Sequence, residues 1–224
     1  MKKFSIAIDG PAGAGKSEVS SILADKLGFV HLDTGALYRT IAYYFLSLNK
    51  KIDENSINKE IYKISVDIKF LDRLQLMYLN GENVTDKIRS MSISKAASDV
   101  SSFGVVRNLL LDVQRNLAKS NNIIMDGRDI STVVLPDADV KIFLTASVEE
   151  RARRRLNQLK QKGIDLRYNE VLNSIKLRDR NDSTRSIAPL KPSKDSRIFD
   201  TTNQSIDEVV VSILYYIKKK INVI

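Results

Sequence analysis

Short apolar runs spread along the chain predict the strands of a buried sheet. They lie at residues 4–8, 29–32, 123–125 and 140–144, and a mixed run at residues 197–201 predicts a further strand. Each run is too short for an ordinary helix and is bounded by polar or turn-forming residues. We therefore expect five short strands, distributed from one end of the chain to the other.

Stretches with helical spacing of apolar residues separate these runs. The clearest start signal is the pair Ser205 and Glu208, a capping box ahead of a helix that continues through Tyr216. The other predicted helices cover residues 18–27, 35–48, 92–119 (with a break or bend near Gly104) and 147–162.

Strands and helices alternate along the chain, which predicts an α/β fold around a parallel sheet with helices on both faces. Residues 49–90 break this alternation. Within them, apolar residues alternate with polar ones at 66–70 and at 74–78, and Asn80-Gly81 is a strong signal for a tight turn. We expect this segment to form a small insert that contains a β-sheet.

The composition limits the classes of protein to consider. The chain has 224 residues, enough for one domain with a substantial core, and it contains no cysteine and one histidine. Disulfides and thiolate metal sites are therefore excluded. No stretch approaches the ~20 apolar residues of a membrane span, and the first apolar run stops at Asp9, too early for a targeting peptide. We expect a cytoplasmic protein without membrane contact, and a monomer.

The positive charge is concentrated in one part of the chain. The net charge is +9, and residues 145–200 contain 14 Lys and Arg against 8 Asp and Glu. A basic surplus of this kind favours an anionic partner, either nucleic acid or a small phosphorylated ligand. The charge alone does not decide between them.

Residues 10–17 have the pattern Gly-x-x-x-x-Gly-Lys-Ser of a phosphate-binding loop, between a predicted strand and a predicted helix. Glycines let the backbone N–H groups turn toward a polyphosphate, and the following helix directs its positive end at the same anion. Lys16 would reach the outer phosphates, and the Ser17 hydroxyl would bind Mg²⁺. The nucleotide-binding residues predicted here are Gly10, Pro11, Ala12, Gly13, Ala14, Gly15, Lys16 and Ser17.

Two further clusters follow predicted strands, at the sheet edge where open α/β sheets bind ligands. In the first, residues 33–39, Arg39 lies about one helical turn in and could grip a phosphate. In the second, residues 126–129, Asp126 has the position of a carboxylate that supports Mg²⁺. Arg128 could hold a phosphate, and Asp129 could accept a hydrogen bond from an exocyclic amine such as that of cytosine. The alternatives are a capped helix start and a local Asp–Arg pair.

The basic segment supplies the last cluster. Its excess is nearly all arginine, which suits phosphate recognition better than lysine does. A solvated helix with internal ion pairs is the alternative. Residues 181–196 contain prolines and serines, as a mobile flap would. The charged residues singled out are Arg151, Arg153, Arg154 and Arg155 on one helix, and Arg178, Asp182 and Arg185, whose spacing predicts a shared helical face.

The four clusters together fit phosphoryl transfer from a nucleoside triphosphate to a phosphate held by arginines. The acceptor oxygen is already anionic at neutral pH, so no general base is required. Catalysis would then consist of positioning and of charge neutralisation by Lys16, Mg²⁺ and the arginines. The single histidine, His31, is interpreted as structural.

At these residues the chain resembles the bacterial cytidylate kinases, within the P-loop nucleoside monophosphate kinase family. The resemblance covers essentially the whole length and rests on IDGPAGAGKS, LDTGALYR, AAS with a downstream VR, DGRDI, ERARRR and RDRNDSTRSIAPL. It implies one kinase unit over residues 1–224, in which an arginine-rich LID occupies about 151–196 and the NMP-binding insert about 49–90. The CORE then comprises about 1–48, 91–150 and 197–224.

The resemblance also implies an activity and a set of residues. The activity is transfer of the γ-phosphate of ATP to CMP or dCMP, with Mg²⁺, in pyrimidine nucleotide metabolism. Two positions depart from the expected pattern: Glu18 stands where such loops usually have Thr or Ser, and Gly104 where a proline is expected. By position, Thr34, Ser98, Arg107 and Asp129 would face the cytosine, Arg39, Arg128 and Arg185 would hold the CMP phosphate, Arg178 and Asp182 would contact the sugar, and Arg154 and Arg155 would approach the transferring phosphate.

Two other functions remain alternatives at this point. One is a P-loop kinase that phosphorylates another small metabolite, which would not need Arg107 and Asp129 to read cytosine. The other is a nucleotide-dependent regulator that binds RNA through its basic segment, which would show strongly salt-dependent binding. Such a regulator should also carry stacking aromatics among its arginines, yet Tyr168 is the only aromatic residue between Arg151 and Arg185.

Overall fold

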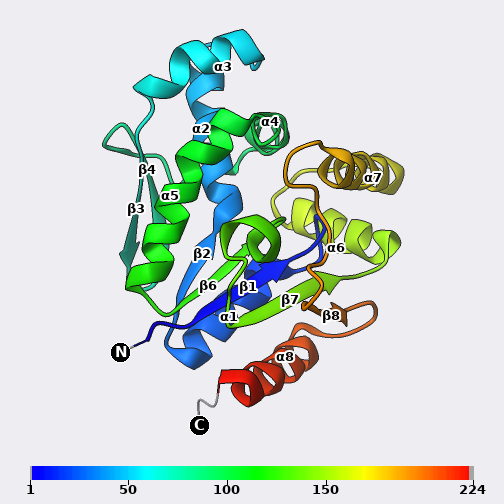
Figure 1. Ribbon diagram of the computed structural model, residues 1–224. Helices are drawn as coiled ribbons and strands as arrows, with labels where there is room; N and C mark the ends of the chain where they lie inside the picture. The colour runs from blue at the N-terminus through cyan, green and yellow to red at the C-terminus, as the bar shows by residue number, and fades with distance from the viewer. Residues whose placement is uncertain (1, 222–224) are drawn as a thin grey trace.

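A five-stranded parallel sheet forms the centre of the computed structural model, which describes residues 2–221 (Figure 1). All four strand pairings are parallel, so the carboxyl ends of the strands share one edge. The predicted strands are all confirmed. In spatial order they are β2 (Val30–Asp33), β6 (Ile123–Gly127), β1 (Ser5–Asp9), β7 (Val140–Thr145) and β8 (Arg197–Asp200).

Helices cover both faces of this sheet, as expected. Successive strand residues point to opposite faces, and in β1 this places Ile6 and Ile8 in one hydrophobic cluster and Ala7 in another. The first cluster includes buried residues of α1 (Lys16–Leu27) and α8 (Ile206–Ile221). The second is covered by α5 (Gly104–Ser120) and by a π-helical turn, η3 (Ile130–Val134).

The insert contains the predicted β-sheet, which is antiparallel, and an unpredicted helix. Its strands are β3 (Val66–Leu71), β4 (Leu74–Leu79) and β5 (Glu82–Asn83). Asn80 and Gly81 both have positive φ, 50° and 85°, and form the predicted tight turn. The helix α3 (Glu54–Glu60) begins where the Asp53 side chain accepts a hydrogen bond from the Ser56 amide. Short 3₁₀ turns, η1 (Ile61–Lys63) and η2 (Lys87–Arg89), flank the sheet.

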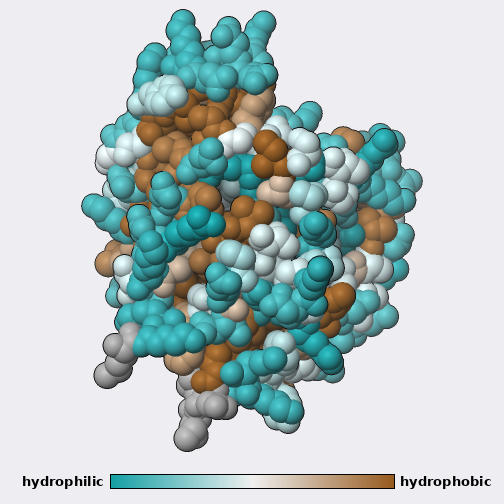
Figure 2. All heavy atoms as spheres, in the orientation of Figure 1, coloured by the Kyte–Doolittle hydropathy of each residue, from teal (hydrophilic) through white to brown (hydrophobic). Residues whose placement is uncertain are grey.

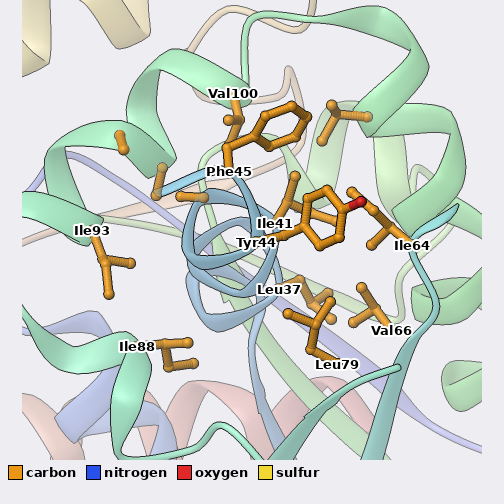
Figure 3. Packing of buried hydrophobic residues seen from close by; sticks show 14 of the residues in the cluster. Leu37, Ile41, Tyr44, Phe45, Ile64, Val66, Leu79, Ile88, Ile93 and Val100 are labelled. Carbon is orange, nitrogen blue, oxygen red and sulfur yellow. The ribbon is translucent and has the colours of Figure 1, made fainter. Parts of the chain in front are cut away.

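One hydrophobic cluster joins this insert to the helices beside it. Figure 3 shows Leu37 and Ile41 of α2 (Thr34–Ser47) at the centre of the cluster, with Val66 and Leu79 of the small sheet on one side and Ile93 of α4 (Met91–Val100) on the other. The cluster extends into the start of α5. In Figure 2 hydrophilic residues cover the α3 end of the molecule, above a region where hydrophobic residues gather.

The expected break near Gly104 is confirmed: α4 ends at Val100 and α5 begins at Gly104. The helix predicted over 147–162 is α6 (Val148–Gln161), capped by the Ser147 hydroxyl, which accepts a hydrogen bond from the Glu150 amide. The predicted capping box of α8 is also present, because Ser205 and Glu208 exchange backbone-to-side-chain hydrogen bonds.

The segment after α6 corrects one expectation. A helix, α7 (Tyr168–Thr184), packs against α6 through a cluster that includes Val171 and Ile175. Because it continues to Thr184, the first four residues of the expected flap at 181–196 are helical. Arg185 caps this helix: its amide donates to the Asn181 carbonyl at 3.2 Å, and its ψ of 144° turns the chain that follows away from the helix. The Leu190 amide then donates to the Asp182 carbonyl.

In the part of the chain that the structure covers, no helix is long and apolar enough to cross a membrane.

Candidate active site

The phosphate loop connects β1 to α1 at the carboxyl edge of the sheet (Figure 1). Gly10, Gly13 and Gly15 have φ of 151°, 77° and 87°, which side chains other than glycine rarely allow. At Gly10 a Cβ atom would also lie 2.0 Å from the Leu144 carbonyl oxygen of β7. The loop is therefore seated directly against the neighbouring strand. Glu18, one of the two departures from the expected pattern, is exposed.

Lys16 begins α1 and is 6% exposed. Its Nζ donates to the Pro11 carbonyl across the loop at 2.8 Å. Burial, and next the positive charge of Arg128, lower the pKa of Lys16 to about 7, against the opposing effect of Asp126. A cation buried beside other cations is in an environment suited to a polyanion.

The two residues predicted to support Mg²⁺ are in direct contact. The Ser17 hydroxyl donates to Asp126 Oδ2 at 2.8 Å, and His31 Nε2 lies 2.7 Å from Asp126 Oδ1. Burial alone would lower the pKa of His31, but the hydrogen bond and the charge of Asp126 raise it overall. His31 thus helps to hold the Asp126 carboxylate in place. Its role here is structural.

Asp9, at the end of β1, is a site residue that sequence reasoning missed. It is fully buried, and its carboxylate accepts hydrogen bonds from the Ile130 amide (2.7 Å), the Ser131 amide (2.8 Å) and the Ser131 hydroxyl (2.5 Å). Burial raises the pKa of Asp9, against those hydrogen bonds. This carboxylate ties η3, and with it the adjacent Asp129, to the strand that precedes the phosphate loop.

At the end of β2, Arg39 is paired with Asp33 (2.6 Å). Burial raises the pKa of Asp33, and the charge and hydrogen bond of Arg39 outweigh it, so that the pKa is lowered. Gln75 of β4 exchanges two hydrogen bonds with the Asp33 backbone, at 2.8 and 3.2 Å. A Cβ at Gly35 would lie 2.9 Å from Asp33 Oδ1. The small sheet is thereby joined to the Arg39 helix where this helix begins.

Thr34 and Ser98, both predicted to face a base, lie in different surroundings. Thr34 is buried, and its hydroxyl donates to the Asp126 carbonyl at 2.8 Å. Ser98 is half-buried on α4 and lines a cavity of about 260 Å³ that also contacts Asp182 and Arg185. Thr34 therefore contacts the strand end itself, while Ser98 lies at a cavity beside α7.

Asp129 lies between two arginines from other elements. Its carboxylate is paired with Arg107 of α5 and with Arg185 (3.4 Å). The Arg107 guanidinium also lies over the Tyr38 ring, 5.6 Å from its centroid, and donates to the Ser101 carbonyl at 3.2 Å. A second cavity, of about 90 Å³, is lined by Tyr38, Arg107 and Asp129 and, at its other side, by Gly104. Two of the four predicted base-reading residues, Arg107 and Asp129, therefore meet here.

A further cationic cluster joins β6 to α7. Arg128 Nε donates to Asp182 Oδ2 at 2.8 Å, and the charges of Arg128 and Arg178 lower the pKa of Asp182 in spite of its burial. The Nε atom of Arg178 is buried and has no hydrogen-bond partner. Burial, then the charge of Arg128, lower the pKa of the Arg178 guanidinium to about 10. A buried guanidinium N–H without a hydrogen-bond partner destabilises the folded protein. This position is therefore suited to binding an anion.

The two arginines predicted to approach a transferring phosphate differ. Arg154 donates to Glu150 (3.0 Å) and makes two hydrogen bonds to Thr201, at the end of β8, of 3.0 and 2.6 Å. Arg154 thus binds protein groups beside the phosphate loop, and a Cβ atom at Gly15 would lie 4.0 Å from its Nη1 atom. Arg155 is half-buried, its pKa is lowered by burial, and its charge is felt at Arg178.

Comparison with known proteins identifies the family of this chain. The family model described as "Cytidylate kinase" matches residues 6–219. A cytidylate kinase of Caldicellulosiruptor saccharolyticus is 51% identical over 215 residues, covering 96% of this chain and 95% of the relative. One of Pseudothermotoga lettingae is 45% identical and covers 100% and 98%. A solved structure from Eubacterium ventriosum, described as uncharacterized, is similar in fold alone, with a TM-score of 0.50, 15% identity and coverage of 97% and 99%.

Proposed function

The chain belongs to the cytidylate kinase family, and we propose that it transfers the γ-phosphate of ATP to CMP or dCMP, giving ADP and CDP or dCDP. The observation that carries this proposal is that two groups of residues suited to binding anions lie at one sheet edge. One is the phosphate loop after β1, and the other is the arginine cluster around Arg178, whose Nε is buried without a partner. A kinase whose acceptor, like ATP, carries phosphate needs both of these sites.

The donor site consists of the loop amides, the N-terminus of α1 and Lys16. Loop N–H groups and the helix dipole favour a polyphosphate, and a bound polyphosphate would restore the full charge of Lys16. Lys16 then neutralises charge on the outer phosphates as the phosphoryl group leaves. The predicted loop residues Gly10 to Ser17 thus form one contiguous ATP site.

Mg²⁺ fits the residues present at Ser17 and Asp126. Both supply oxygen atoms, which are 2.8 Å apart, and this cation prefers oxygen ligands with only one or two from protein carboxylates. Residues 2–221 contain no group of three or more His, Cys, Asp or Glu side chains arranged to hold a metal, so phosphate and water oxygens would complete the coordination. When bound there, the ion would neutralise the negative charge that develops on the phosphate oxygens during transfer.

The acceptor site is assigned to arginines of α2, of the turn after β6, and of α7 with its C-terminal cap. Arg39, Arg128 and Arg185 hold the CMP phosphate, and Arg178 with Asp182 contacts the sugar end. Forked guanidinium groups suit phosphate oxygens. The present partners of these arginines, Asp33 and Asp182 among them, are carboxylates that keep buried cations paired.

The base site is assigned to Thr34, Ser98, Arg107 and Asp129. Asp129 would accept a hydrogen bond from the exocyclic amine of cytosine, the donor that distinguishes this base from uracil or thymine. Its two arginine partners, Arg107 and Arg185, hold the carboxylate in place. Selectivity for cytosine therefore depends on a buried charge network.

Phosphoryl transfer here consists of alignment and charge neutralisation. The acceptor phosphate oxygen attacks the γ-phosphorus, the bond to the β-phosphate oxygen breaks, and no proton has to be removed from the acceptor. Arg128, Arg154, Arg155 and Arg185 join Lys16 in stabilising the transferred group. We further propose that the protein acts as a cytoplasmic monomer, without nucleic-acid or membrane partners.

A substrate panel tests this function. ADP formation from Mg·ATP would be measured with CMP, dCMP, UMP, AMP, GMP and dTMP, beside a blank without acceptor. Turnover led by CMP and dCMP is the expected result. Turnover only with an acceptor other than a pyrimidine monophosphate, or hydrolysis alone, would contradict the base-site assignment and favour a kinase of another metabolite. Tight RNA binding that weakens steeply with salt would favour the regulator instead.

A further inference from the structure

Arg151 of α6 is a buried arginine that the proposed reaction does not use. Its side chain is 7% exposed. Nε donates to the Ala146 carbonyl at the end of β7 (2.9 Å), while Nη1 donates to the Ala12 carbonyl (3.0 Å) and to Asp179 Oδ2 of α7 (2.6 Å). A guanidinium in this position joins three elements, the sheet, the phosphate loop and α7.

Ala12 is held on both sides of its peptide unit. Its carbonyl accepts from Arg151, and its amide donates to Asp179 Oδ1 at 3.4 Å. The next residue, Gly13, is in contact with α6, because a Cβ atom at Gly13 would lie 3.2 Å from the Cβ atom of Arg151. The middle of the phosphate loop thus rests on α6 and is fastened by one ion pair, which we call the Ala12 clasp (Arg151 and Asp179).

The helix that supplies Asp179 also carries acceptor residues. Arg178 precedes Asp179, and Asp182 follows three residues later, paired with Arg128. Because the Nε atom of Arg178 has no partner, a bound acceptor nucleotide would add an interaction to this same helical turn. One turn of α7 therefore contacts the donor loop on one side and belongs to the proposed acceptor site on the other.

We infer that Arg151 and Asp179 are positioning residues that couple the two substrate sites. They hold Ala12 so that the phosphate loop has its binding conformation, and they make that conformation depend on the position of α7. Acceptor binding at Arg178 and Asp182 fixes α7 and thereby raises the affinity of the loop for ATP. This inference rests on the proposed function, because it needs a phosphate-bearing acceptor at α7.

Reciprocity makes the coupling measurable. If the acceptor strengthens ATP binding by some factor, ATP strengthens acceptor binding by the same factor. The clasp has to be intact for either effect, since it is a continuous chain of contacts from α7 to Ala12. Loss of one partner also leaves the other buried and uncompensated, so the two residues act as a unit.

The decisive variant is Asp179→Asn, which preserves size and removes the ion pair. Calorimetry would give the Kd of a non-hydrolysable ATP analogue with Mg²⁺, with and without CMP. We expect CMP to tighten analogue binding to the wild type by about fivefold or more. In the variant this factor falls to near one and the analogue Kd rises about tenfold, while the Kd of CMP alone stays unchanged.

Glu149→Gln is the matched control, because it removes the same charge from an exposed position on the helix that packs against α7. It should leave both binding constants and their coupling as in the wild type. Arg151→Lys keeps the charge but not the fork that reaches three partners, so it should reproduce the loss of coupling. The double variant Arg151→Gln with Asp179→Asn should lose no more than the worse single variant.

A thermal melt separates positioning from folding. If Asp179→Asn melts lower but retains the wild-type coupling factor and analogue Kd, the clasp is structural only and the inference is overturned. Unchanged coupling in Arg151→Lys would overturn it as well. Failure of the proposed function looks different, because the wild-type protein itself would then not turn over CMP or bind it.

Discussion

The proposed donor and acceptor sides of this site are built in opposite ways. The donor side is one contiguous stretch, residues 10–17, in which backbone N–H groups and glycine conformations would supply most of the contacts with phosphate. The proposed acceptor side consists of side chains from α2, from α5, from the turn after β6 and from α7, held in position by pairs such as Asp129 with Arg107 and Arg128 with Asp182. The donor side therefore depends on backbone conformation, and the acceptor side depends on a network of paired charged side chains.

This difference determines how each side tolerates change. A binding loop built from backbone groups loses function when a key side chain or glycine is replaced. Substitution of the other residues of the loop has little effect. In a network of charged side chains, the removal of one side chain also affects its partners, because a charged partner is then left buried and unpaired. Effects on the donor side should therefore be large and confined to catalysis, and effects on the acceptor side should combine substrate affinity with stability.

The largest effect is expected from Lys16→Ala on the donor side. Removal of the buried ammonium takes charge stabilisation from the outer phosphates, and turnover should fall by about 10³-fold. ADP formation with saturating CMP measures it, and the Kd of CMP alone, expected to be unchanged, is the control. Wild-type turnover in this variant would contradict the assignment of the donor site.

Asp129→Ala should raise the KM for CMP by about 10²-fold, because it removes the base contact and leaves Arg107 and Arg185 unpaired. The KM for ATP should change less than about threefold. Steady-state kinetics with each substrate varied in turn distinguishes the two. An equal loss for both substrates would point to Mg²⁺ or folding, and the contrast between the two sides would then not hold.

Arg178→Gln is predicted to trade affinity for stability. The buried Nε of Arg178 has no partner, so its removal relieves a desolvation cost and should raise Tm by about 2–4 °C. The KM for CMP should rise about tenfold, as expected for loss of one charged hydrogen bond. Arg180→Gln, an exposed neighbour on α7, serves as the control. A lower Tm with unchanged KM would show that Arg178 is a structural cation.

The smallest effect concerns Glu60, which lies outside both sides of the site. Hydrogen bonds from Lys50, and then from Tyr44, lower the pKa of Glu60 from 4.5 to about 2. A carboxyl with a lowered pKa in the folded protein stabilises it above pH 4.5, and this contribution is lost as the pH falls from 4.5 to about 2.

Glu60→Gln should therefore flatten the acid side of the stability profile and leave both KM values unchanged. Urea unfolding between pH 3 and 7 would measure it, and Glu54→Gln, at the exposed start of the same helix, is the control. An unaltered dependence on pH would show that Glu60 contributes no linkage.

The sequence alone placed the phosphate loop between a strand and a helix, as the structure has it, since a contiguous motif needs no tertiary information. The nucleotide-binding roles of its residues stay predictions. The five strands followed in the same way from short apolar runs. Asp126 was placed correctly beside Ser17, because carboxyl ends of parallel strands share one edge. Roles on the acceptor side came from resemblance, and they stay predictions.

What could not be predicted depends on contacts between distant segments. Asp9 reads as the last residue of a strand, and nothing nearby shows that its carboxylate accepts the amides of Ile130 and Ser131. The first part of α7 was missed because its buried face is narrow, although the four-residue spacing of Val171 and Ile175 was a usable signal.

The cluster shared by α2, the small sheet, α4 and the start of α5 has a consequence for protein engineering. A deletion of residues 49–90, or their exchange for the equivalent loop of another kinase, would strip the apolar partners from Leu37, Ile41 and Phe45 and expose them to water. Such chimaeras should aggregate unless α2 and α4 are replaced together with the loop. The smallest transplantable unit for altering acceptor choice is therefore about residues 34–110, a graft nearly twice as long as the loop it would be designed to exchange.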